Sequence, residues 1–168
     1  SGDLMSDYLT NMKTEVEILH GLGNSPHVVA LYGACFEPEN MFFVMELMEG
    51  GSLEQVYKED KWVNTPLSTL IRLLSDAAAG LIFLAGSNPP VIHRDLRCAN
   101  ILIDGKGHAQ VADFGLSQVK HNPCPDIASV ARGDTTPWQW SPPELLRGHA
   151  STKSDIFMLG CCIAELLA

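Results

Sequence analysis

Apolar residues recur at helical spacing in three stretches of the chain. Residues 6–22 and Leu67–Ala85 show the period of a helix with one buried face, and a third stretch begins near Ser154 and continues to Ala168. In the longest stretch the apolar positions are Leu67, Leu70, Ile71, Leu74, Ala77, Ala78, Leu81 and Ile82. We therefore predict three main helices, and a short fourth helix near Leu53–Tyr57.

The flanks of the longest predicted helix carry residues that favour its boundaries. Thr65 is expected to cap the helix, because its hydroxyl can accept a free backbone N–H. Pro66 is expected at the first helical position, where no N–H is needed. The sequence Asn88-Pro89-Pro90 is expected to end the helix, since proline cannot continue it.

Two pairs of short apolar runs predict β-hairpins. Val28–Phe36 and Met41–Leu47 are separated by Glu37–Asn40, whose Pro and Asn favour a turn. Ile101–Ile103 and Ala109–Ala112 flank a second turn, which contains two glycines. Residues beyond this hairpin, 114–141, show no steady period and are rich in Pro, Ser, Thr, Asp and Gly, so they are predicted to form a long surface loop.

Composition narrows the class of protein. The 168 residues suit one domain, and 46% apolar with 18% charged residues is typical of a globular one. The formal net charge of −9 argues against a nucleic-acid partner or an anionic membrane surface, both of which need a basic footprint. Ile156–Ala168, the longest strongly apolar stretch, contains Glu165 and is shorter than the roughly 20 residues of a spanning helix, so no membrane segment is expected.

The cysteines favour a reduced, intracellular chain. None of the five forms a Cys-x-x-Cys pair, which disfavours a zinc ribbon or a thioredoxin-type site. Cys161 and Cys162 are neighbours, so a bridge between them is disfavoured. We expect a cytoplasmic location, with the alternative that the chain is the cytosolic part of a larger protein.

Three strings in order point to one chemistry. They are His93-Arg94-Asp95-Leu96-Arg97-Cys98-Ala99-Asn100, then Asp113-Phe114-Gly115, then Ser141-Pro142-Pro143-Glu144 followed by Ser154-Asp155-Ile156-Phe157-Met158-Leu159-Gly160. The sequence resembles the eukaryotic protein kinase family, in its tyrosine-kinase and tyrosine-kinase-like group, whose catalytic loop, Asp-Phe-Gly and Ala-Pro-Glu motifs these strings match. Pro142 stands where the family usually has alanine.

The resemblance implies an α+β, protein kinase-like fold that covers nearly the whole chain. Residues 1–45 would be a partial small lobe with helix C and two strands, residues 46–51 the hinge, and residues 52–168 the first half of the mainly helical lobe. No glycine-rich loop or strand lysine precedes Glu15, and Lys13 lies on the same helix on a different face. We therefore expect a kinase domain truncated at both ends, and a chain that is by itself weak or inactive in phosphotransfer.

The resemblance also implies catalytic roles. Asp95 matches the catalytic base, and Asn100 and Asp113 match the ligands of Mg²⁺, a hard ion that prefers oxygen donors. Arg97 matches a cation that meets the transferring phosphate. Glu15 matches the helix-C glutamate, with Glu17 as its competitor. ATP and Mg²⁺ are thus the implied cofactors and a protein is the implied substrate.

Further residues match the nucleotide pocket and the packing around the site. Met45 takes the gatekeeper position, the backbone of Glu46 and Met48 would bind adenine, and Leu102 would form the floor of the pocket. The family's regulatory stack is matched by Leu19, Leu31, His93 and Phe114. Asp155 matches the acid that braces the catalytic loop, and Arg94 matches an arginine that can pair with a phosphorylated loop residue. For the apolar ones, plain core packing is an equally good account.

The hydroxyl that accepts the phosphate is less clear from the sequence. Trp140 and the Asn88-Pro89-Pro90 stretch resemble tyrosine-kinase-like enzymes, whereas residues 114–143 contain no tyrosine to serve as a switch. Ser129, Thr135 and Thr136 are the candidate switch sites. We favour serine/threonine activity over tyrosine activity. A scaffold that uses the kinase fold for binding without phosphotransfer is the alternative function.

Overall fold

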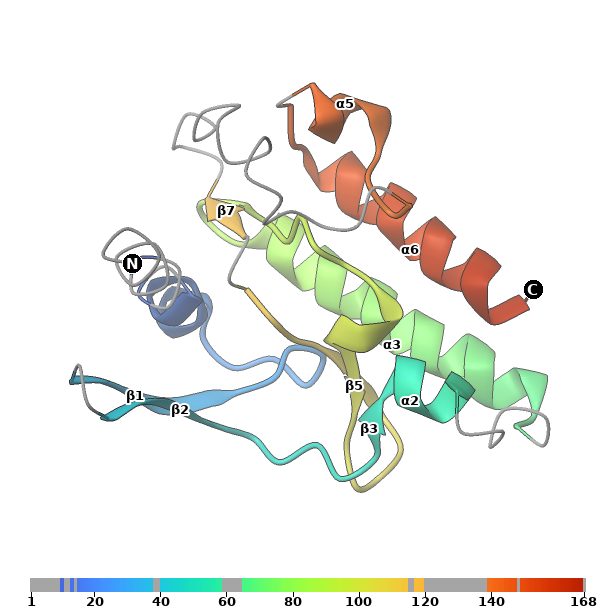
Figure 1. Cartoon of the computed structure of the whole chain (residues 1–168), viewed down its shortest axis with the longest axis horizontal. Helices are drawn as coiled ribbons and strands as arrows, with labels where there is room; N and C mark the ends of the chain where they lie inside the picture. The colour runs from blue at the N-terminus through green and yellow to red at the C-terminus, as the bar shows by residue number, and fades with distance from the viewer. Residues whose placement is uncertain are drawn as a thin grey trace.

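The computed structural model describes residues 10, 13, 15–37, 40–58, 65–114, 117–119, 139–147 and 149–167. Residues 10, 13 and 15–22 are helical, as the apolar period of 6–22 predicts. The antiparallel pair β1 (Leu31–Glu37) and β2 (Asn40–Met45) follows and extends away from the long helices (Figure 1). The first predicted hairpin is thus confirmed.

The first strand begins three residues later than predicted, because the residues before it pair elsewhere. Val28 forms a parallel bridge with Val111, and the Val29 N–H donates to the Val111 carbonyl at 3.0 Å. The Val111 N–H in turn donates to the His27 carbonyl at 2.9 Å. The segment that follows the N-terminal helix is therefore attached to the edge of a second sheet.

That second sheet contains β3 (Gly51–Ser52), β5 (Ile101–Ile103) and β6 (Ala109–Val111), antiparallel in the order β3-β5-β6. The predicted hairpin of β5 and β6 is confirmed. Its turn is held by Asp104, whose Oδ1 accepts the N–H groups of Lys106 and His108 at 2.9 and 2.8 Å. Gly107 takes a φ of 81°, a left-handed conformation that glycine adopts without strain.

The helices are α2 (Leu53–Lys58), α3 (Leu67–Gly86), α5 (Pro143–Leu146) and α6 (Thr152–Leu167), with a 3-10 turn η2 at Cys98–Asn100. The predicted cap of α3 was wrong. Pro66 is itself the N-cap, with an extended ψ of 139° and no side-chain cap hydrogen bond of its own. Its carbonyl accepts the N–H groups of Thr69 and Leu70, so the backbone closes the first turn.

Helix α3 runs through the middle of the core. Its Leu73, Ala77, Leu81 and Leu84 are buried, and it contacts β6, α6 (Figure 1) and the short strand β4 (Val91–Ile92). By length and apolar composition alone α3 would suffice to cross a membrane, a test that core helices of soluble proteins also pass. The prediction that no membrane segment is present rested on Ile156–Ala168 and did not take α3 into account.

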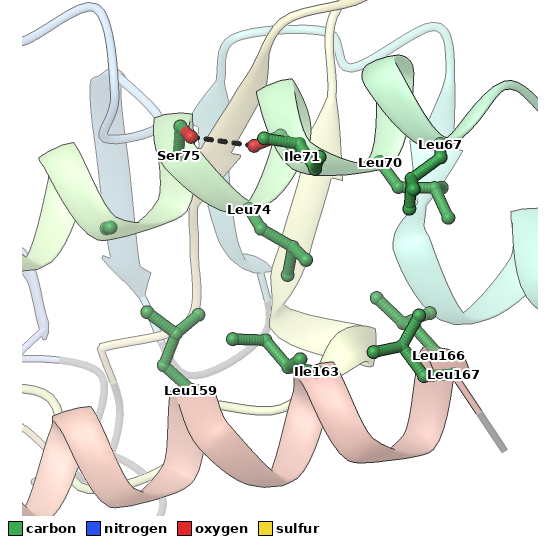
Figure 2. Close-up of a pocket in the computed structure, with 10 residues that line it drawn as sticks. Leu67, Leu70, Ile71, Leu74, Ser75, Leu159, Ile163, Leu166 and Leu167 are labelled. Atoms are coloured by element: carbon green, nitrogen blue, oxygen red, sulfur yellow. Dashed lines mark hydrogen bonds between the residues drawn. The ribbon is translucent and has the colours of Figure 1, made fainter.

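An apolar groove of about 360 Å³ lies between α3 and α6. Figure 2 shows leucine and isoleucine side chains from the two helices facing one another across it. Leu67 and Leu74 contribute from α3, and Leu159 and Ile163 from α6. This groove is separate from the polar cluster described below and belongs to the packing of the helical half of the molecule.

Part of the predicted loop 114–141 is a strand. β7 (Gln118–Val119) pairs antiparallel with β4 (Val91–Ile92), in the register Val91↔Val119 and Ile92↔Gln118. Two-residue strands are too short to show a period, and their pairing is set by distant parts of the chain, so the sequence pattern missed them. Residues 120–138 lie outside the described part of the structure.

Candidate active site

The loop between β4 and β5 is held in place by hydrogen bonds to a residue of α6. Asp155, in the first turn of α6 and 3% exposed, accepts the His93 N–H at Oδ2 and the Arg94 N–H at Oδ1, both at 2.9 Å. Arg94 has a left-handed φ of 71°, which is uncommon for a residue with a side chain and persists where the surroundings fix it. Burial raises the pKa of Asp155, and interactions with His93 and Arg94 oppose that rise.

Asp95 follows in this loop and is buried, with an exposed fraction of 8%. The Asn100 side chain donates through Nδ2 to the Asp95 carbonyl at 2.8 Å and to the Asp95 Oδ2 at 3.1 Å. The other carboxylate oxygen, Oδ1, is buried and accepts no hydrogen bond from the residues that the structure describes. Buried oxygens of this kind are rare, so Oδ1 is suited to accept a proton donor from outside the chain.

Asp113 is attached to the catalytic loop through its neighbour Ala112. The Ala112 N–H donates to the Asn100 carbonyl at 2.9 Å, and the Ala112 carbonyl lies 3.0 Å from the His93 Nε2. Asp113 itself has an exposed side chain and a left-handed φ of 66°. The end of β6 is therefore attached to both ends of the loop that carries Asp95.

The two candidate metal ligands fit a magnesium ion chemically. Because Asn100 uses Nδ2 to hold Asp95, its Oδ1 is the end of the amide left for an ion. Asp113 supplies an exposed carboxylate. Amide and carboxylate oxygens are ligands that Mg²⁺ accepts, and it commonly takes the rest of its shell from water and phosphate oxygens.

Helix residues 15–22 bring one acid to this cluster. Glu15 is 9% exposed and its Oε1 accepts the Phe114 N–H at 3.2 Å, whereas Glu17 is exposed. Burial raises the pKa of Glu15, the Phe114 hydrogen bond lowers it, and the charge of Asp113 adds to the rise. Of the two candidates for the helix-C position, Glu15 is thus the one that contacts the Asp-Phe-Gly segment.

Aromatic packing joins the two motifs. The rings of His93 and Phe114 lie 5.1 Å apart at 60° and both are fully buried. Leu19 packs against the core, and Leu31 is half-buried. The Ser117 hydroxyl donates to the His93 carbonyl at 3.1 Å. Ser117 lies outside the motifs, and a single serine there carries no signal in the sequence.

The segment after β2 contains the backbone groups predicted to bind adenine. The Glu46 N–H donates to the Ala30 carbonyl at 2.9 Å, and the Met48 carbonyl accepts the Gly51 N–H at 3.1 Å. These two bonds use neither the Glu46 carbonyl nor the Met48 N–H. Met45 pairs with Leu31 at the end of the β1–β2 hairpin.

Leu102 and Arg97 complete the set of predicted site residues. Leu102 is half-buried between the buried Ile101 and Ile103, so its side chain lies on the opposite face of β5. Arg97 is half-buried, and its Nε–H donates to no acceptor among the described residues. Gly115 and the candidate switch residues Ser129, Thr135 and Thr136 lie outside the described residues.

Comparison with known proteins identifies the arrangement. The family model for protein tyrosine and serine/threonine kinases matches residues 3–168. The chain belongs to this protein kinase family. Its kinase-like α+β fold, expected from the motifs, is thereby confirmed.

Individual kinases show the same similarity. An EPD1-interacting receptor-like cytoplasmic serine/threonine-protein kinase of Nicotiana benthamiana is 37% identical over 155 residues, which cover 92% of this chain and 33% of that kinase. The dual specificity protein kinase shkA of Dictyostelium discoideum is 37% identical over 162 residues, covering 94% and 30%. The probable serine/threonine-protein kinase PBL11 of Arabidopsis thaliana is 38% identical over 146 residues, covering 85% and 37%. The chain spans about a third of the length of these kinases.

Proposed function

We propose that this chain carries the phosphotransfer centre of a protein kinase that moves the γ-phosphoryl group of ATP to a serine or threonine hydroxyl. The observation that carries the proposal is the buried Oδ1 of Asp95, which accepts no hydrogen bond from the described residues while Asn100 holds the rest of that carboxylate. A carboxylate oxygen in this state can accept and orient the hydroxyl of a substrate.

Each site residue then has a task. Asp95 accepts the hydroxyl proton at Oδ1 and so points the hydroxyl oxygen toward the phosphorus. Asn100 restrains Asp95 through two hydrogen bonds from one nitrogen, one to the Asp95 backbone carbonyl and one to its carboxylate Oδ2. Arg97, two residues on, supplies a cation for the transferring phosphate. Because phosphoryl transfer requires little covalent work from the protein, positioning and charge account for most of the catalysis.

Asn100 and Asp113 would hold Mg²⁺, which, when bound, neutralises charge on the phosphate oxygens. Glu15 holds the segment that follows Asp113 through the Phe114 N–H and so helps to fix the direction of the Asp113 carboxylate. The Glu46 carbonyl and the Met48 N–H would bind the adenine edge. Met45 would border the base and Leu102 would pack beneath it.

The acceptor is proposed to be serine or threonine on a protein. Two of the three kinases compared above are named serine/threonine kinases and one is named a dual specificity kinase. We also propose an intracellular location, either as a cytoplasmic protein or as the cytosolic part of a larger one, in line with the relative that is named cytoplasmic.

The test is a phosphotransfer assay on the full-length protein with labelled ATP and a generic protein substrate, followed by identification of the phosphorylated amino acid. Loss of a catalytic base should lower kcat by about 10²–10⁴-fold in Asp95→Asn. The matched control is Asp104→Asn, which alters an aspartate in the β5–β6 turn and should leave kcat within about twofold.

Two results would contradict the proposal. If Asp95→Asn is as active as the wild type, Asp95 is not the base. If the wild type binds ATP but transfers no phosphate above the Asp95→Asn background, the chain functions as the non-catalytic scaffold considered in the sequence analysis. Label found on tyrosine alone would overturn only the choice of acceptor.

A further inference from the structure

Ser154 occupies a junction for which neither the motifs nor the family comparison supplies a role. It is fully buried in the first turn of α6. Its hydroxyl donates to the Glu144 Oε1 at 3.0 Å and accepts the Ser151 N–H at 3.1 Å. One hydroxyl thus joins the Ser-Pro-Pro-Glu segment at α5 to the start of α6.

The next residue connects the same helical turn to the catalytic loop. Asp155 holds the N–H groups of His93 and Arg94, and Asp95 follows directly in the chain. Adjacent residues in a helical turn move together, because the backbone between them is fixed. The first turn of α6 therefore lies between Glu144 on one side and the catalytic loop on the other.

We propose that Ser154 is a positioning residue for phosphotransfer, and that its hydroxyl links the placement of Glu144 to the placement of Asp95. The inference rests on the proposed function and deepens it. Without the hydroxyl, the Glu144 carboxylate loses a donor and the first turn of α6 loses the acceptor of the Ser151 N–H. The helical turn that carries Asp155 is then less fixed, and so is the catalytic loop that Asp155 holds.

The kinetic test compares Ser154→Ala, Glu144→Ala and the double variant in the full-length protein. Small displacements at a reacting centre are costly, so each single variant should lower kcat by about tenfold to a hundredfold, with the KM for ATP within about twofold of the wild type. The double variant should be no slower than the slower single variant, since both remove the same link. Glu144→Gln keeps an acceptor oxygen for Ser154 and should recover most of kcat.

The matched control is Ser75→Ala. The Ser75 hydroxyl also belongs to a helix, and it donates to the Ile71 carbonyl of its own helix at 2.7 Å, on the exposed side of α3 (Figure 2). This variant should leave kcat unchanged. A role of Ser154 in stability alone would lower the melting temperature yet leave kcat per folded molecule unchanged; that pattern would overturn the inference.

Hydrogen exchange supplies a readout that needs no activity. The amides of His93 and Arg94 should exchange about tenfold faster in Ser154→Ala and Glu144→Ala than in the wild type or Ser75→Ala, because their acceptor becomes less fixed. Equal exchange at these two amides in all four proteins would refute the link even if the wild type transfers no phosphate. A wild type no more active than Asp95→Asn, by contrast, would refute the proposed function.

Discussion

The β1–β2 hairpin and the catalytic loop are both short segments that mix polar and apolar residues, but they differ in burial and in where their hydrogen-bond partners lie along the chain. No residue of β1 or β2 is buried, and the two strands pair with each other, with a shift of register between Leu31 and Gly33 (Figure 1). The loop from His93 to Asn100 has its key groups buried and bonded to residues far along the chain, such as Asp155. The hairpin is therefore specified locally and the loop by tertiary contacts.

This contrast predicts where substitutions are costly. The largest effect should come from Asp155→Ala, which leaves the buried His93 N–H and the partly buried Arg94 N–H without their acceptor. Hydrogen bonds to a charged group, and the cost of unsatisfied partners, suggest a loss of roughly 2–5 kcal/mol in the free energy of unfolding. Urea unfolding measures it, and kcat should fall by about a hundredfold or more because the loop loses its support. A loss below about 1 kcal/mol would show that the loop holds its own conformation.

The next test addresses the segment that leads from the N-terminal helix into the hairpin, where α3 packs against it. Gly80 of α3 faces the His27 carbonyl and Val111, and a Cβ built there would lie 2.6 Å from the carbonyl oxygen and 2.8 Å from the valine Cγ2. Gly80→Ala should therefore destabilise the protein by about 1–3 kcal/mol, since backbone cannot yield easily. Gly86→Ala, in the same helix, meets nothing within 4 Å and should be neutral or slightly stabilising. Thermal unfolding of both variants checks the prediction, and equal melting temperatures would contradict it.

The hairpin should tolerate change. Phe42 is 52% exposed and Val44 is 47% exposed on β2. Phe42→Thr keeps a residue that favours strands and removes little buried area, so its effect on the free energy of unfolding should lie within about 0.5 kcal/mol. Leu84→Ala, which empties a fully buried position in α3, is the contrasting control and should cost about 2–5 kcal/mol. A large cost at Phe42 would mean that the outer face of the hairpin packs against something in solution.

The same contrast explains what could be predicted from the sequence. Period and turn residues predicted α3, α6 and both hairpins, because those signals are local. The strand pair Val91–Ile92 with Gln118–Val119, and the roles of Ser117 and Ser154, could not be predicted in this way, since each depends on a partner brought near by the fold. The candidate site was located by its motifs, whose spacing favoured Glu15 over Glu17, and the hydrogen bond that joins Glu15 to the Phe114 N–H is a tertiary contact that no local pattern shows.

The smallest effect is a pH dependence at Glu15. Burial raises the pKa of this carboxyl above its ordinary value of 4.5, and the nearby charge of Asp113 adds to the rise. A raised folded-state pKa means that the stability contributed by Glu15 is fully present below the unfolded-state pKa and is lost as the pH rises through the folded-state pKa. Wild type should therefore lose stability relative to Glu15→Gln as the pH rises above about 4.5.

Urea unfolding of both proteins across that range measures the difference. Glutamine keeps an oxygen for the Phe114 N–H but does not titrate, so the two stability curves should diverge as the pH rises. Glu17→Gln, on the exposed face of the same helix, should give curves that stay parallel to the wild type. If the wild type instead gains stability over Glu15→Gln with rising pH, the prediction is wrong. The charged Glu15 carboxylate would then be stabilised by a cation and held as tightly as the groups of the catalytic loop.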